Sequence, residues 1–169
     1  RSLPGMSVIN PSTYNQSRAV VKYLCENDLK GPCYLRLGRQ PVPEVYKDQT
    51  FQLGKGIVHK VGGKGVVFST GCVLYDVLEA TKDVDITVVD MPTIKPLDKE
   101  IIRKYSFKNV FGGLGSAVAE TLADEGLNCK LTRIGVNDVF PESGLPCDLY
   151  EKYGLSSNKI NQRIKSVLG

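Results

Sequence analysis

Arg39 is the residue of this chain best placed to bind a charged ligand. It follows the apolar segment 33–37, which we expect to be a short strand, and precedes a proline-rich stretch. Ligands of α/β proteins commonly bind beyond the carboxyl ends of strands. A guanidinium there can hold a phosphate through two parallel hydrogen bonds, which a lysine cannot do. The alternative is an ordinary surface arginine that pairs with Glu44, and these residues alone favour that alternative. Arg36 is expected to face solvent.

A second candidate is the glycine-rich stretch 111–116, Phe-Gly-Gly-Leu-Gly-Ser, which opens a helical pattern. The apolar residues that follow have the spacing of one buried helical stripe: Leu114, Ala117, Val118 and Leu122. A dinucleotide-binding fingerprint needs a third small residue where this chain has Val118. The helix start could still attract an anion. We expect instead that Gly112 and Gly113 allow close packing of the helix against a neighbouring element.

The remaining titratable residues do not form a recognisable catalytic pattern. His59 is the single histidine, with no acid or nucleophile near it in the sequence and no Gly-x-Ser-x-Gly elbow elsewhere, so we predict a surface residue. The acid pairs Asp83/Asp85 and Asp124/Glu125 lie near helix ends and lack the spacing of a metal cluster. We therefore predict no catalytic, cofactor-binding or metal-ligating residue in this chain.

Composition indicates a soluble globular protein. The chain has 169 residues, a net charge of +4, 41% apolar and 24% charged residues. Its apolar runs are far shorter than the ~20 residues that span a bilayer, and no leader pattern is visible, so we expect no membrane association. The five cysteines lack Cys-x-x-Cys spacing, which argues against a zinc site or disulfide framework and favours the cytoplasm. The lysines at 55, 60 and 64 lie among glycines and predict a solvated turn, not a nucleic-acid surface.

The elements that must position these residues divide the chain at residues 41–48, where Pro41 and Pro43 predict a linker. Before it, Thr13 is a candidate N-cap of a helix, and Gln16 would complete a capping box. After it, strands and helices alternate, which predicts a three-layer α/β domain. The expected strands cover 50–53, 65–69, 84–89 and 128–136, the first two as a pair. The expected helices cover 73–78, 97–105, the stripe from Leu114, and the C-terminal segment capped by Ser156 or Ser157.

The stretch Phe-Gly-Gly-Leu-Gly-Ser-Ala-Val-Ala-Glu at 111–120, together with Asn137 to Gly144, resembles the C-terminal domain of transketolases. The resemblance is greatest to split forms, whose halves are separate chains. Residues 1–6 and 31–40 resemble the end of the preceding domain, which binds the thiamine pyrimidine. The resemblance implies that 1–40 end that domain, 41–48 are a linker, and 49–169 form the C-terminal domain with a mostly parallel five-stranded sheet.

The same resemblance implies an activity for the whole enzyme. Transketolases use thiamine diphosphate and Mg²⁺ to move two-carbon ketol units between sugar phosphates, as in the pentose phosphate pathway. In the element Leu37-Gly-Arg-Gln40, Arg39 would contact the substrate phosphate. The diphosphate-and-metal motif, the activating glutamate and the substrate-polarising histidines of the family have no counterpart here. An N-terminal transketolase subunit or section would therefore supply the cofactor site, and the C-terminal domain would form a homodimer.

Three alternatives stay open. They are a 1-deoxyxylulose-5-phosphate synthase, a 2-oxoacid dehydrogenase β subunit, and a non-catalytic dimerisation module. The segment Phe140 to Gly144 favours split transketolases. Two departures from the family are visible: Thr13 replaces a usual aspartate, and 106–111 is too short for the strand that relatives carry there. We expect either the loss of a central strand or, by preference, residues missing from this segment.

Overall fold

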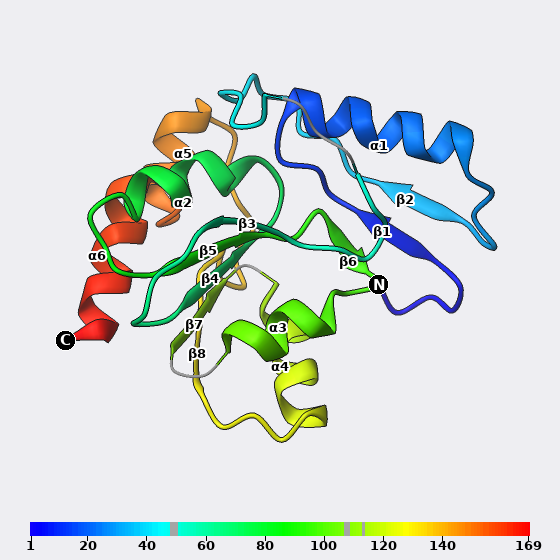
Figure 1. The fold of residues 1–169 in the computed structure, drawn as a ribbon. Coiled ribbons are helices and arrows are strands. Elements are labelled where there is room, and N and C mark those ends of the chain that lie inside the picture. Colours follow the sequence, from blue (N-terminus) through cyan, green and yellow to red (C-terminus); the bar gives the residue numbers. More distant parts are fainter. Residues whose placement is uncertain (48–50, 107–108, 113) are drawn as a thin grey trace.

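Two sheets organise the chain in the computed structural model, which describes residues 1–47, 51–106, 109–112 and 114–169 (Figure 1). The smaller sheet has the order β2-β1-β6. Strands β1 (Ser7–Ile9) and β2 (Cys33–Leu35) are parallel, and β6 (Thr93–Lys95) is antiparallel to β1. Because β6 comes from the later part of the sequence, this pairing ties the two parts of the chain together.

Helix α1 (Tyr14–Glu26) covers the smaller sheet. Thr13 is its N-cap, as predicted, and accepts a hydrogen bond from the backbone N–H of Gln16. The side chain of Gln16 turns back to the N–H of Ser12 instead of Thr13, so the capping box is displaced by one residue. Val20 meets Ile9 and Phe51 in a buried apolar cluster, which holds the helix on the sheet.

The larger sheet confirms the predicted fold class, with the order β3-β5-β4-β7-β8. Its strands are β3 (Ile57–Lys60), β4 (Val66–Ser69), β5 (Thr87–Asp90), β7 (Asn109–Gly112) and β8 (Lys130–Arg133). Only β3 runs antiparallel to its neighbour; the other pairs are parallel. Helices cover both faces, as expected of parallel strands that are buried on both sides.

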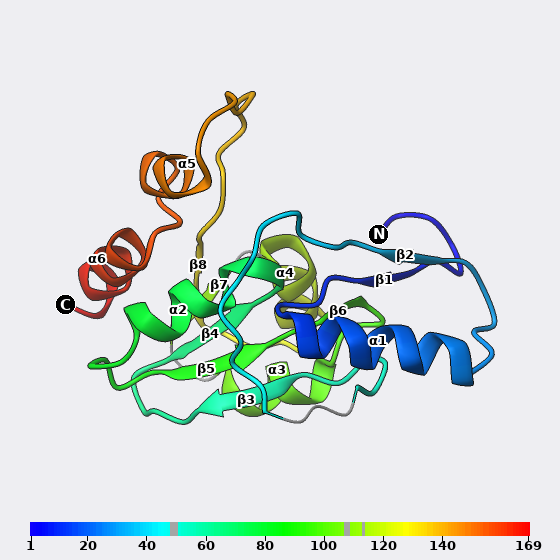
Figure 2. The same ribbon diagram turned by 90° about the horizontal axis from the view of Figure 1, so that it is seen from above.

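Alternation along the strands divides the core of the larger sheet into two layers. Val67 and Val88 face a cluster with α2 (Leu74–Ala80) and α6 (Ser157–Leu168). Val66 and Val89 face the opposite cluster with α3 (Lys99–Tyr105) and α4 (Gly115–Asp124). A 3₁₀ turn, Gly71–Val73, precedes α2, and α5 (Pro146–Lys152) precedes α6. Figures 1 and 2 show α2 and α6 on one side of the sheet and α3 on the other.

Three predictions about the strands were wrong. The strand expected over 50–53 lies instead at β3; Phe51 enters the core beside Ile9, and Thr50 lies outside the described residues. The predicted pairing is absent as well, since β4 pairs with β5 and β7. The central strand was not lost: β7 (Asn109–Gly112) begins four residues after α3 ends at Tyr105. That residues are missing from this segment stays a prediction. Neither β6 nor α5 was predicted.

Gly62 provides a test of how tightly the larger sheet is packed. A Cβ at this position would lie 2.3 Å from the backbone nitrogen of Ile86, and backbone cannot move aside as a flexible side chain can. We expect Gly62→Ala to destabilise the fold by about 1–3 kcal/mol, the usual range for overpacking. Urea unfolding would measure the change. Gly135→Ala is the matched control, because a Cβ there meets nothing within 4 Å; equal stability of the two variants would contradict the expectation.

Candidate functional site

Arg39 lines a cavity of about 510 Å³ between the start of α1 and the segment that follows β2. The walls include Pro11, Thr13 and Ser17 on one side and Leu37 on the other. Strand β2 ends at Leu35, so Arg39 lies four residues beyond the strand and not at its end as predicted. Its side chain is exposed and can reach a ligand that enters the cavity from outside.

Glu44, the alternative partner of Arg39, is engaged elsewhere. Its carboxylate accepts hydrogen bonds from the backbone N–H groups of Asn15 (2.8 Å), Val45 (3.0 Å) and Tyr46 (2.9 Å). Burial raises the pKa of Glu44, but the hydrogen bonds led by those from Asn15 and Tyr46 outweigh it, so the pKa lies below its usual value. The ion pairs found among the described residues do not include Arg39.

A buried polar network lies behind this cavity, centred on Asp90 at the carboxyl end of β5. Asp90 is fully buried and accepts hydrogen bonds from Ser12 Oγ at 2.7 Å, Gln16 Nε2 at 2.7 Å and Tyr46 Oη at 2.6 Å. Two of its three donors come from the start of α1, and the third, Tyr46, comes from the segment 41–47 between β2 and β3. The carboxylate therefore fastens both to the larger sheet.

His59 extends this network, and the prediction of a surface histidine was wrong. Its Nε2 lies 2.8 Å from Tyr46 Oη, and the two rings are 4.9 Å apart between centroids. The residue is half-buried because β3 places it against the linker. Sequence reasoning could not find this contact, since neither Tyr46 nor Asp90 is a near neighbour of His59 in the chain.

Burial sets the protonation states in the network. Burial raises the pKa of Asp90, although the hydrogen bonds that this carboxylate accepts, first among them that from Tyr46, lower it. Burial also raises the pKa of Tyr46, and the nearby charge of Asp90 raises it further. Burial lowers the pKa of His59, against the attraction of Asp90. Because the Tyr46 hydroxyl donates to Asp90, its oxygen accepts from the histidine, which assigns a proton to Nε2 of His59. The lowered pKa favours the neutral ring.

This assignment predicts how stability depends on pH. The folded-state pKa of His59 lies below its ordinary value of 6.5, so the unfolded chain binds the proton first. We expect stability from this group to be complete above pH 6.5 and to fall as the pH drops through that value. Urea unfolding between pH 5 and 8 would show the slope, and His59→Gln should reduce it. An unchanged slope in that variant would contradict the lowered pKa.

Close packing is seen at Gly115 of the glycine-rich stretch, whereas the packing expected of Gly112 and Gly113 stays a prediction. Gly112 ends β7, residue 113 lies outside the described residues, and α4 begins at Gly115. A Cβ at Gly115 would lie 2.7 Å from Cδ of Arg133, so this glycine lets the side chain from β8 lie directly on the start of α4. The predicted stripe from Leu114 to Leu122 is buried.

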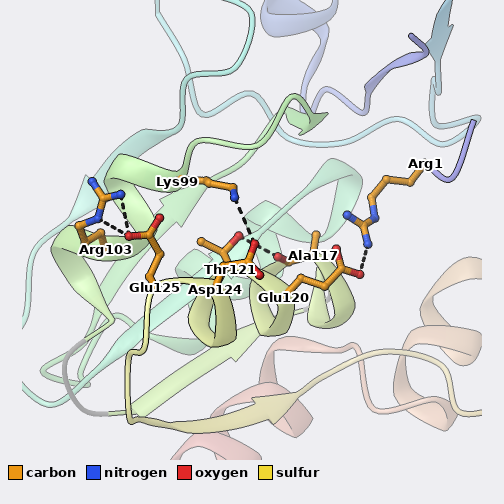
Figure 3. A network of polar contacts seen from close by, with 8 residues as sticks. All are labelled: Arg1, Lys99, Arg103, Ala117, Glu120, Thr121, Asp124 and Glu125. Carbon is orange, nitrogen blue, oxygen red and sulfur yellow. Dashed lines mark hydrogen bonds and ion pairs between the residues drawn. The ribbon is translucent and has the colours of Figure 1, made fainter. Parts of the chain in front are cut away.

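Exposed ion pairs on α4 account for one of the acid pairs (Figure 3). Asp124 pairs with Lys99 at 3.3 Å and Glu125 with Arg103 at 2.8 Å, both from α3, while Glu120 pairs with Arg1. The Thr121 hydroxyl donates to the carbonyl of Ala117 within the helix. Exposed pairs of this kind contribute at most about 1 kcal/mol each. The pairs of Lys99 and Arg103 join α3 to the end of α4.

Metal-ligating side chains are not clustered in the described part of the chain. Within 1–47, 51–106, 109–112 and 114–169, no three or more His, Cys, Asp or Glu side chains gather where they could hold a metal ion. All five cysteines are free. Among these same residues, no helix combines the length and apolar character needed to cross a membrane.

The fold is mixed α/β, with a five-stranded, mostly parallel sheet between two layers of helices and a smaller three-stranded sheet beside it. Arg39 lines a cavity next to the start of α1. The family of the transketolase C-terminal domain matches residues 54–160. The chain therefore belongs to the transketolase family.

Individual relatives agree with this assignment. A Methanocaldococcus jannaschii protein, provisionally named as a transketolase C-terminal section, is 37% identical over 97% of this chain and 56% of its own length. A 6-deoxy-6-sulfo-D-fructose transketolase subunit of Clostridium sp. is 35% identical over 95% of this chain and 54% of its own length. A 1-deoxy-D-xylulose-5-phosphate synthase of Pseudomonas aeruginosa is 32% identical over 99% of this chain and 28% of its own length.

A solved structure supports the fold directly. A split-gene transketolase, described as an inactive beta4 tetramer, superposes with a TM-score of 0.89 and 38% identity. The match covers 99% of this chain and 59% of that one. The chain spans about half the length of the M. jannaschii and Clostridium relatives. The alignment with the M. jannaschii protein runs over 179 positions, so it is longer than this chain. That relative therefore has residues with no counterpart here.

Proposed function

We propose that this chain is the C-terminal part of a split transketolase that transfers two-carbon ketol units between sugar phosphates. Residues 1–40 end the pyrimidine-binding domain, 41–48 are the linker, and 49–169 are the C-terminal domain. The whole enzyme works in the cytoplasm, in the pentose phosphate pathway. The observation that carries the proposal is Arg39, an exposed guanidinium on the wall of an open cavity, with its alternative partner Glu44 already engaged.

In this proposal Arg39 binds the phosphate of the substrate. A bidentate guanidinium both attracts and orients a phosphate, so the far end of the sugar is fixed while its reactive end points elsewhere. The buried network behind the cavity holds the start of α1 and the linker against the larger sheet, and both of these segments flank Arg39. Thiamine diphosphate and Mg²⁺ are bound by regions or a partner chain outside the described residues. When bound, the cofactor supplies the carbanion chemistry.

Reconstitution tests the proposed function. The chain is mixed with an N-terminal transketolase subunit, thiamine diphosphate and Mg²⁺, and ketol transfer is followed from a ketose phosphate to an aldose phosphate. We expect transfer only when all four components are present. No transfer, with both subunits folded and associated by sizing, would overturn the proposal.

The relative from P. aeruginosa supports a second candidate, a 1-deoxyxylulose-5-phosphate synthase. The same reconstituted sample distinguishes the two. A synthase would release CO₂ from pyruvate in the presence of an aldose phosphate, whereas a transketolase would not. Release of CO₂ from pyruvate without a sugar-phosphate acceptor would instead favour a 2-oxoacid dehydrogenase.

We further propose that the C-terminal domain forms a homodimer through an apolar projecting segment, residues 136–145. Figure 2 shows the chain between β8 and α5 extending from the body of the molecule. Its large apolar side chains are exposed, and Phe140 has a relative exposure of 103%. The other three are Val136, Val139 and Leu145. Exposed apolar groups gathered in one segment are typical of interaction sites.

Phe140→Ser is expected to weaken self-association without affecting the fold. An aromatic anchor of an interface contributes about 2 kcal/mol or more, so the dissociation constant should rise by roughly 30-fold or more. Sedimentation equilibrium would measure it. Val61→Ser is the control, since Val61 is also exposed but lies beyond β3. An unchanged constant, or equal weakening by both variants, would contradict this use of the segment. A tight dimer with no activity beside its partner chain would favour a non-catalytic dimerisation module.

A further inference from the structure

A second cavity, of about 470 Å³, forms where parallel strands of the two sheets reach their carboxyl ends. Apart from Arg1 and Ile94, the residues that line it follow β1, β2, β4, β7 or β8 or lie at the end of β8. They include Asn10, Arg36, Thr70, Ser116, Arg133 and Asn137. Carboxyl ends of strands that meet at one place are the usual position of ligands in α/β proteins. None of these residues lines the Arg39 cavity.

The charge of this cavity is positive and uncompensated. Arg36 and Arg133 line it, and the ion pairs found between described residues include neither. A third arginine of the lining, Arg1, is paired with Glu120. The described part of the lining contains no aspartate or glutamate. Two guanidinium groups in one cavity repel each other unless an anion lies between them.

The surroundings of Arg133 fit an anion as well. The absent side chain of Gly115 allows Arg133 to lie on the start of α4, where a Cβ would come within 2.7 Å of its Cδ and Nε. A positive charge at the start of a helix is unfavourable by itself because the helix dipole is positive there. The first turn of α4 has no acidic residue, and its N-cap makes no side-chain hydrogen bond. A bound anion would offset both the charge of Arg133 and the positive end of the α4 dipole.

We propose that this cavity binds the phosphate group of a small metabolite, held between Arg36 and Arg133. Two planar guanidinium groups can each present two donors to phosphate oxygens. The amides of Asn10 and Asn137 and the hydroxyls of Thr70 and Ser116 line the same space and can contact the rest of the ligand. This function is separate from the phosphate binding proposed for Arg39, because the two cavities share no residue.

The test is a titration of the full chain with inorganic phosphate at constant ionic strength, followed by the NMR amide resonances of Ser116 and Gly135. We expect saturable shifts in the wild type. Arg133→Gln and Arg36→Gln should each weaken binding by about 10-fold or more, because each removes charged hydrogen bonds. Arg133→Lys should fall between, since it keeps the charge and loses the fork.

Two matched variants make the outcome decisive. Arg103→Gln removes the same charge from a surface arginine of α3 and should leave the titration unchanged. Arg39→Ala should leave it unchanged too, so a failure of the Arg39 proposal would not be mistaken for a failure of this one. Thermal melting checks that each variant is folded. Absence of saturable shifts in the wild type, or equal weakening by Arg103→Gln, would overturn the proposal.

Discussion

Replacing Arg39 by alanine is expected to lower kcat/KM of the reconstituted enzyme by about 10- to 150-fold for phosphorylated substrates. The reason is the loss of charged hydrogen bonds to the phosphate, which contribute about 1.5–3 kcal/mol. Steady-state kinetics with matched phosphorylated and unphosphorylated acceptors would measure the effect. The loss should be confined to the phosphorylated member of each pair.

Two further variants sharpen this expectation. Arg39→Lys keeps the charge but not the two-pronged geometry, so it should recover only part of the activity. Arg18→Ala removes another exposed arginine, one that lies over the ring of Tyr14 on α1, and should leave kcat/KM near the wild-type value. If Arg39→Ala lowered kcat/KM equally for unphosphorylated acceptors, the residue would not be binding phosphate.

The parts of the fold that were predicted correctly depend on local patterns. The cap at Thr13, the stripe from Leu114 to Leu122 and the β-branched run of β5 are each set by residues close together in the chain. The strand β3 was misplaced because the segment 50–53 is equally apolar, and Phe51 was needed in the core beneath α1. Strand β6 is only three residues long and exists through its pairing with β1, so no local signal marks it.

The candidate site also contains features that neighbouring residues in the sequence indicate and features that they do not. The position of Arg39 beyond a strand could be read from its own neighbours, a strand before it and prolines after it, while its role stays a prediction. The Asp90 network could not, since it joins residues from four separate segments. One signal was available: Asp90 follows a run of buried β-branched residues, where a lone carboxylate must find partners.

Asp90 is where a single substitution should harm stability most. Asp90→Ala would leave the donors of Ser12, Gln16 and Tyr46 without an acceptor in a buried setting. Each buried unsatisfied group costs about 1–3 kcal/mol, and the sum is not additive, so we expect a loss of about 3–5 kcal/mol. Urea unfolding at pH 7 would measure it, and Asp83→Ala, at an exposed acid, is the control.

A double-mutant cycle shows whether the loss arises from the network itself. Tyr46→Phe removes the hydroxyl that donates to Asp90 and contacts His59, and keeps the ring in the core. If the two side chains act together, the double variant should be more stable than the sum of the single effects predicts, by about 1 kcal/mol or more. Strict additivity would mean that Asp90 stabilises the junction through Ser12 and Gln16 alone, and a loss below about 1 kcal/mol for Asp90→Ala would mean that the linker is held by its apolar contacts.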